Sequence, residues 1–111
     1  MSTVIQVTAN NNFPIRLTAN NFPSWRKQIQ SSLIGLDLDA YIDGTKKPPA
    51  KFLDAENTKP NPDYNLWFRQ DQTILSAILG SCSDAIQPLI SSADTSKDAW
   101  ERLITSFANK S

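Results

Sequence analysis

The segment NPDYNLWFRQDQTILSAILG, residues 61–80, predicts the longest helix of this chain. Asn61 and Pro62 are typical of a helix start, because an asparagine side chain accepts hydrogen bonds from first-turn amides and a proline there loses no backbone bond. Large apolar residues then recur along the segment, and they are Tyr64, Trp67, Phe68, Ile74, Leu75, Ile78 and Leu79. At about 100° per residue they cover an arc of roughly 140°, so we expect one face of a central helix to lie in a core.

Asp71 falls in the middle of that apolar arc. A carboxylate among aromatic and aliphatic neighbours is costly unless it accepts hydrogen bonds. We therefore expect Asp71 to be a structural acceptor, either of an indole N–H or of the amides in the first turn of another segment. A catalytic role would need a second acid or base nearby, and the chain contains no histidine.

Two further helices are predicted, each with a tryptophan near its start. The first begins around Phe22 or Pro23, after the capping residues Asn20 and Asn21. The last follows Thr95-Ser96-Lys97-Asp98, a pattern that resembles a capping box. The expected inward residues are Phe22, Trp25, Ile29, Leu33 and Leu36 in the first helix and Trp100, Leu103, Ile104 and Phe107 in the last. Three helices with one large anchor each indicate an all-α scaffold around a single core.

The segments between these helices are expected to be short or polar. Residues 38–42 predict a brief helical piece that ends at Asp43-Gly44, a natural stop. Residues 45–60 predict a polar, proline-bearing loop, which is either a solvated connector or a place where lysines meet an acidic partner. Residues 81–92 predict a short helix that is broken or kinked near Pro88, because proline inside a helix removes one hydrogen bond.

The first seventeen residues differ from the rest of the chain. Two β-prone runs, at 4–7 and 13–17, are separated by small and polar residues. They predict either a short hairpin or a loose arm, because an isolated two-stranded hairpin is marginal unless it packs on something. The chain therefore divides into an N-terminal arm or hairpin, residues 1–17, and a helical domain, residues 18–111.

Composition argues against several classes of function. Eleven Lys and Arg residues balance eleven Asp and Glu residues without a long block of either sign, which is not the pattern of a nucleic-acid binder. Cys82 is the only cysteine, and without histidine it indicates neither a disulfide framework nor a metal site. We expect no cofactor, metal ion or catalytic residue. No signal-peptide pattern and no run of roughly 18 apolar residues is present, so we expect an intracellular protein outside membranes.

Four motifs follow one another along the chain. They are LTANNFPSW at 17–25, IDGT at 42–45 with prolines at 48 and 49, NPDYNLW at 61–67 with Asp71, and TSKDAWERL at 95–103 with FA at 107–108. In their order and spacing, the region from about Ile15 to the end resembles the N-terminal part of the Gag polyprotein of Copia-type LTR retrotransposons, most like those of plants.

The resemblance implies a structural capsid domain and no enzyme. Its fold would be a compact all-α bundle of about five helices like a retroviral-type capsid N-terminal domain, with a short N-terminal β-hairpin as an option. Copies would associate as pentamers or hexamers and, with a C-terminal capsid domain, build a cytoplasmic virus-like shell. The element's RNA would bind to other parts of Gag. The candidate residues for contacts between subunits are Val4, Ile5 and Val7 in the arm and Ile34, which lies off the inward stripe of its helix.

Two other functions stay open. A Gag domain adopted by its host could act as an adaptor that binds a peptide in a groove between helices. Direct RNA binding would require basic side chains to gather on one face, namely Lys46, Lys47, Lys51 and Lys59 with Arg16, Arg26 or Lys27.

Overall fold

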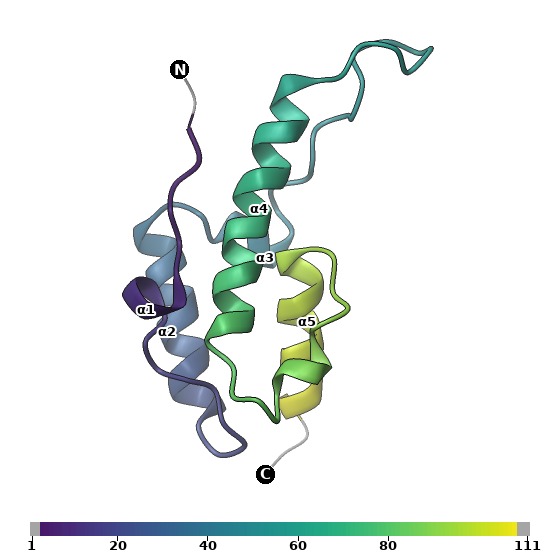
Figure 1. Cartoon of the computed structure of the whole chain (residues 1–111). Coiled ribbons are helices and arrows are strands. Elements are labelled where there is room, and N and C mark those ends of the chain that lie inside the picture. Colours follow the sequence, from purple (N-terminus) through teal and green to yellow (C-terminus); the bar gives the residue numbers. More distant parts are fainter. Residues whose placement is uncertain (1–2, 109–111) are drawn as a thin grey trace.

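The computed structural model describes residues 3–108, and over that range it contains five α-helices and one 3-10 helix. They are α1 (Ala9–Asn12), α2 (Phe22–Gly35), α3 (Ala40–Asp43), α4 (Pro62–Gly80), η1 (Gln87–Leu89) and α5 (Ser96–Ala108). Figure 1 shows α4 in the middle of the molecule, with α2 on one side and α5 on the other. The predicted all-α bundle of about five helices is confirmed.

The two longest helices begin where they were expected, but only one of them has its asparagine cap. Asn61 Oδ1 accepts a hydrogen bond from the Asp63 amide at 3.0 Å, as an N-cap residue does. Asn21 precedes α2 without capping it, because its side chain accepts from the Thr18 amide at 2.7 Å and donates to the Arg16 carbonyl at 2.8 Å. The expected asparagine cap of α2 is therefore wrong, since that side chain closes the preceding turn instead.

Aromatic side chains join the helices around the core. The rings of Trp25 and Trp100 lie 5.8 Å apart between centroids, and those of Phe22 and Phe107 stack at 4.9 Å. Both pairs connect α2 to α5. Trp25 Nε1 also donates to Ser81 Oγ at 3.1 Å, which ties α2 to the end of α4. The indole N–H of a fully buried tryptophan is thereby satisfied.

The predicted core residues fall into three groups. The buried ones are Trp25, Ile29, Leu33, Asp71, Ile74, Ile78, Trp100, Leu103 and Phe107. The half-buried ones are Phe22, Tyr64, Trp67, Leu75 and Ile104. Phe68 is 41% exposed, so its assignment to the core is wrong. Phe68 lies near one edge of the apolar arc of α4. The N-terminal arm, and not another helix, packs at this edge, and it covers Phe68 only in part.

The N-terminal arm forms no hairpin within the described residues, and it is not loose. Residues 3–8 form an extended segment beside α4 (Figure 1). The Ile5 amide donates to Gln70 Oε1 at 2.7 Å, and Gln70 Nε2 donates to the Ile5 carbonyl at 2.9 Å. Gln28 makes the same pair of bonds with Ile15, at 2.7 and 3.0 Å. We call these two contacts the glutamine clamps, because each side chain bonds the arm backbone as a neighbouring strand would.

Part of the arm belongs to the hydrophobic core. Val7, Phe13 and Leu17 are 5%, 1% and 0% exposed. The assignment of Val7 to an assembly interface is therefore wrong, because its side chain packs inward. Ile5, two residues before Val7, is 42% exposed, so it stays available as a candidate interface residue.

The segment after α4 is not the short α-helix predicted for residues 81–92. The Leu17 amide donates to the Ser81 carbonyl at 2.7 Å, and the Ser83 amide donates to the Leu17 carbonyl at 3.0 Å. These bonds form an isolated parallel bridge that holds the chain out of a helix just after α4. Pro88 then lies in the first turn of η1, where a proline removes no helical hydrogen bond.

The short helix α3 begins at Ala40, two residues later than predicted, and ends at the expected stop. Gly44 follows it with a φ of 81°, the left-handed conformation that glycine adopts without strain. The side chain of Lys97 lies close to the α-carbon of Gly44, so a side chain at this position would meet α5. No helix within residues 3–108 is both long and apolar enough to cross a membrane.

The polar loop of residues 45–60 projects from the helical body beyond the first turn of α4 (Figure 1). The molecule is correspondingly long, with extents of 50 × 26 × 23 Å. The loop closes on itself through an antiparallel bridge between Phe52 and Pro60 and a hydrogen bond of 2.8 Å from the Leu53 amide to the Lys59 carbonyl. We refer to residues 45–60 as the projecting loop.

Candidate functional site

Asp71 is the only charged side chain that is buried among the described residues. Ser96, the first residue of α5, donates its amide hydrogen to both carboxylate oxygens, at 3.2 and 3.3 Å. The Ser96 hydroxyl donates to the main-chain carbonyl of Asp71 at 2.8 Å, and Gln72 Nε2 donates to Asp71 Oδ2 at 3.3 Å. This is the second of the two predicted arrangements, in which the carboxylate accepts an amide from the first turn of another helix.

The pKa values of Asp71 and of its neighbour Tyr41 are both raised at this site. Burial raises the pKa of its carboxyl, while the hydrogen bonds from Ser96 and Gln72 act in the opposite direction. The pKa of Tyr41 is raised by burial and by the nearby charge of Asp71. Within residues 3–108, no group of three or more His, Cys, Asp or Glu side chains could hold a metal ion. Through its hydrogen bonds with Ser96, Asp71 attaches the start of α5 to α4.

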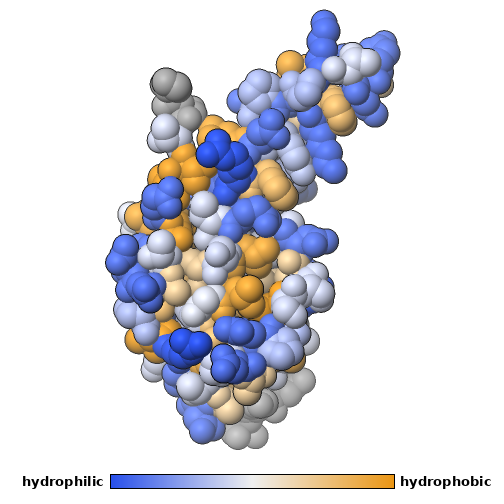
Figure 2. Space-filling view, in the orientation of Figure 1, coloured by the Kyte–Doolittle hydropathy of each residue, from blue (hydrophilic) through white to orange (hydrophobic). Residues whose placement is uncertain are grey.

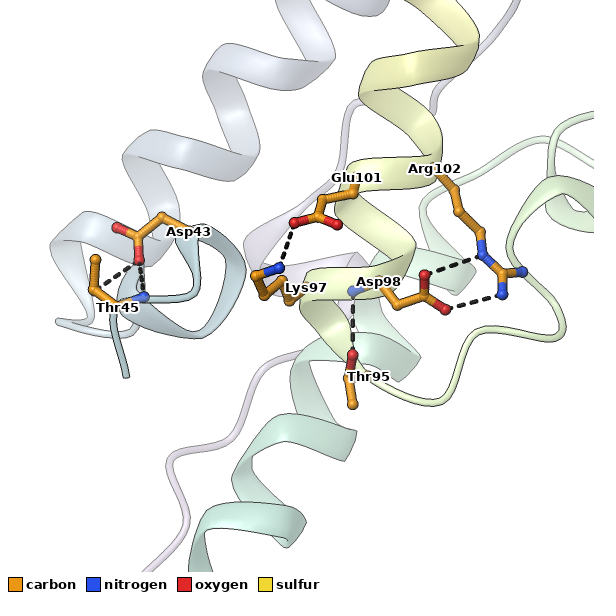
Figure 3. Close-up of polar contacts among 7 residues, drawn as sticks. All are labelled: Asp43, Thr45, Thr95, Lys97, Asp98, Glu101 and Arg102. Atoms are coloured by element: carbon orange, nitrogen blue, oxygen red, sulfur yellow. Dashed lines mark hydrogen bonds and ion pairs between the residues drawn. The ribbon is translucent and has the colours of Figure 1, made fainter. Parts of the chain in front are cut away.

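The charged side chains in the first two turns of α5 pair with their own neighbours (Figure 3). Thr95 Oγ1 accepts from the Asp98 amide at 3.1 Å, which is one half of the predicted capping box. Asp98 pairs with Arg102 one turn later at 2.9 Å, and Lys97 pairs with Glu101 in the same way. Pairs of this kind stabilise a helix by a few tenths of a kcal/mol each, so this surface supports the helix start.

The end of α3 has a similar local arrangement beside α5 (Figure 3). Asp43 Oδ1 accepts from the amide and the hydroxyl of Thr45, at 2.8 and 2.7 Å. These hydrogen bonds lower the pKa of the Asp43 carboxyl. The Asp43 side chain therefore closes the turn after α3.

The remaining candidate interface residues lie on two separate elements. Ile34 is 62% exposed on α2, and it borders a depression of about 240 Å³ between Lys27 and Asp43. On the arm, Ile5 is 42% exposed and Val4 is half-buried. Val4 and Ile34 border different hollows of the surface.

A larger groove, of about 570 Å³, lies between the N-terminal arm and α4, and we call it the arm groove. Its walls are Val4, Gln6, Val7 and Thr8 on the arm and Phe68, Arg69, Gln72, Thr73 and Ser76 on α4. Figure 2 shows apolar side chains gathered next to the arm on this face. The groove was not predicted from the sequence. The one signal that could have indicated it is the position of Phe68, near the edge of the apolar arc and with polar neighbours on its outer side.

Three of the basic side chains considered for RNA binding have local partners of their own. Lys46 Nζ lies 5.5 Å from the ring centroid of Tyr41, and Lys51 Nζ lies 5.7 Å from that of Tyr64. Arg16 lies 3.9 Å from a carboxylate oxygen elsewhere, that of Asp84. Each of these three cations has its own local partner, which gives no support to a basic surface for RNA.

Known proteins resemble this chain over most of its length. Residues 29–111 match the family described as the gag-polypeptide of LTR copia-type. Over 97 residues, or 86% of the chain, it is 40% identical to the Retrovirus-related Pol polyprotein from transposon RE2 of Arabidopsis thaliana. It is 39% identical over the same length to the polyprotein from transposon RE1 of that plant. The chain spans about 7% of the length of each relative.

No solved structure gives a significant match to the fold. The family assignment therefore depends on sequence similarity, in which the family model and the two relatives agree. The family model covers well over half of the chain, and two relatives share about two residues in five with it. On this evidence the chain belongs to the gag-polypeptide family of copia-type LTR retrotransposons.

Proposed function

We propose that this chain is a structural, non-enzymatic Gag domain that associates with copies of itself. With a second capsid domain, such contacts would build a cytoplasmic particle around the RNA of a copia-type element. Membership of the Gag family supports the structural role. The surroundings of Asp71 agree with it, because the one buried charge among the described residues holds two helices together.

The observation that favours self-association most is the exposure of Ile34. Its inward neighbours on α2, Ile29 and Leu33, are fully buried, whereas Ile34 is 62% exposed. A single exposed isoleucine is ordinary, but this one borders a depression that a neighbouring side chain could enter. Covering its exposed part would contribute about 1 to 2 kcal/mol per contact. Contacts of this size suffice for assembly when a ring or shell repeats them many times.

The charge of the chain fits a building block. Eleven positive and eleven negative residues leave no net charge, so copies would not repel each other strongly. Three of the basic residues considered for RNA binding have separate local partners. We therefore assign RNA binding to other parts of Gag.

Sedimentation velocity of the chain over a series of concentrations tests the proposal. We expect reversible association that Ile34→Asp weakens, because the new carboxylate would lose its water in the contact. Thr105→Asp, at an exposed position of α5, is the matched control and should associate like the wild type. Both variants should melt near the wild-type temperature, since both positions are exposed. A monomer at every concentration, or equal weakening by both substitutions, would contradict the proposal.

A further inference from the structure

We propose that the tip of the projecting loop, residues 52–56, docks into the arm groove of a second copy of this chain. The inference rests on the self-association proposed above and names one contact that would produce it. The tip presents two apolar side chains followed by acidic ones, and the groove presents an apolar wall beside a basic side chain.

The projecting loop is braced internally, so its tip is held in place. Besides the bond from Leu53 to Lys59, the Asp54 carboxylate accepts from the amides of Thr58 and Lys59, at 2.9 and 3.0 Å. It also accepts from the Thr58 hydroxyl. These hydrogen bonds lower the pKa of Asp54. Loops of this length in small domains are uncommon and often functional, and an ordered one can present its tip to a partner without a large loss of freedom.

Both apolar side chains of the tip are exposed in their own molecule, Leu53 more than Phe52. Leu53 is 65% exposed, the highest value for a large apolar side chain among the described residues, and Phe52 is 37% exposed. Neither side chain belongs to the hydrophobic core or packs against it. Figure 1 shows the tip beyond the start of α4 and turned away from the arm, so the groove of the same molecule is out of its reach.

The arm groove has the size and the preformed walls that such a tip requires. Its volume of about 570 Å³ lies within the range of about 300 to 1,000 Å³ that is typical of ligand pockets, and the groove is open to solvent along one side. Phe68, which is 41% exposed, supplies an apolar wall on α4. The glutamine clamp between Gln70 and Ile5 fixes the opposite wall, so the groove does not have to form during binding.

The charges of the tip and the groove are complementary. Arg69 is the only charged residue that lines the groove, and no ion pair forms to it within residues 3–108. Glu56 is exposed at the tip and likewise has no ion pair over that range. A tip that enters a neighbour's groove would bring these two groups together. Complementarity of this kind selects the partner and its orientation more than it adds affinity.

The tip and the groove are different surfaces, so the contact is heterologous. Each copy would give its tip to one neighbour and its groove to another. Contacts of this type close into rings when the rotation between copies permits it, and they otherwise continue as open chains. The first geometry is the one that a shell made of rings needs.

Charge exchange tests the pairing of Glu56 with Arg69. In sedimentation velocity, Glu56→Arg and Arg69→Glu should each weaken association about five- to tenfold, and a chain with both substitutions should return close to the wild-type affinity. Lys47→Glu, a charge reversal in the same loop outside the tip, is the matched control and should have little effect. A double variant that associates no better than the single variants would overturn the pairing.

Disulfide trapping tests the placement of the tip. Leu53→Cys chains mixed with Phe68→Cys chains under mild oxidation should yield a dimer with one chain of each kind. Leu89→Cys, at a position as exposed as Phe68, is the control and should give little mixed dimer. The native Cys82 should not compete, because it is buried and burial raises the pKa of its thiol to about 12.

The outcomes separate this contact from the proposed function. Association that persists unchanged in the charge variants, with no preference of Leu53→Cys for Phe68→Cys over Leu89→Cys, overturns the docking of the tip and leaves self-association standing. A chain that does not associate under any condition overturns both. Restored affinity in the double charge variant together with the mixed dimer supports the contact.

Discussion

Replacement of Gln70 by alanine should release the start of the N-terminal arm while the helices stay folded. The Gln70 side chain is 5% exposed, and it donates one hydrogen bond to the backbone of Ile5 and accepts another. A hydrogen bond within a protein contributes about 0.5 to 1.5 kcal/mol, so this clamp should hold the arm by about 1 to 3 kcal/mol. Because about 1.4 kcal/mol corresponds to a factor of ten, the Ile5 amide should exchange its hydrogen about 5- to 150-fold faster in the variant.

Amide hydrogen exchange followed by NMR measures this release residue by residue. Gln28→Ala is the matched control, because it removes the equivalent clamp at Ile15 and leaves the one at Ile5 in place. Each substitution should accelerate exchange at its own isoleucine. An unchanged rate at Ile5 in Gln70→Ala, or acceleration at both isoleucines in either variant, would refute the reasoning.

Three further predictions concern the core. Asp71→Leu leaves the buried Ser96 amide unpaired, at a cost of about 1 to 3 kcal/mol. This should lower the melting temperature by roughly 4 to 8 °C per kcal/mol. An unchanged melting temperature would contradict the structural role of Asp71. The raised pKa of Asp71 means that the folded state binds its proton more tightly than the unfolded state. The part of the free energy of unfolding that comes from this pKa shift is therefore full below the unfolded pKa, near 3.8. It is lost as the pH rises through the folded value. Denaturant unfolding across this pH range should show that contribution in the wild type and not in Asp71→Asn, and parallel curves would contradict it. Trp25→Ala should destabilise the fold by about 3 to 5 kcal/mol and Trp67→Ala by less. Trp25 is fully buried and hydrogen-bonded, whereas Trp67 is half-buried and its Nε1 has no hydrogen-bond partner within residues 3–108. A larger loss of stability in Trp67→Ala, measured by denaturant unfolding, would be inconsistent with this packing.

Helices α2, α4 and α5 could be predicted because their signals are local. Proline near the first position, a capping side chain and apolar residues at steps of three or four act within one or two turns of the chain. Gly44 ended α3 where expected for the same reason, since its left-handed backbone is a property of that residue and its neighbours. The family resemblance arose from the same motifs.

The arm and the groove could not be predicted, because they depend on contacts between residues far apart in the chain. Gln70 and Ile5 are 65 positions apart, and no local pattern marks a glutamine as the partner of a backbone segment. Val7 and Phe68 were assigned wrongly for a related reason. Each lies where the arm meets α4, and periodicity describes which face of one element is apolar without saying which other element covers it. For Asp71 the kind of partner followed from the cost of burial, while the choice of Ser96 followed from the fold.

Electron microscopy of an expressed copia-type Gag that contains this chain tests the proposed role most directly. If the domain is a self-associating part of a shell, the wild type and Thr105→Asp should form closed, regular particles, and Ile34→Asp should form few or none. Absence of particles in the wild type, or particles that Ile34→Asp leaves unchanged, would contradict the account.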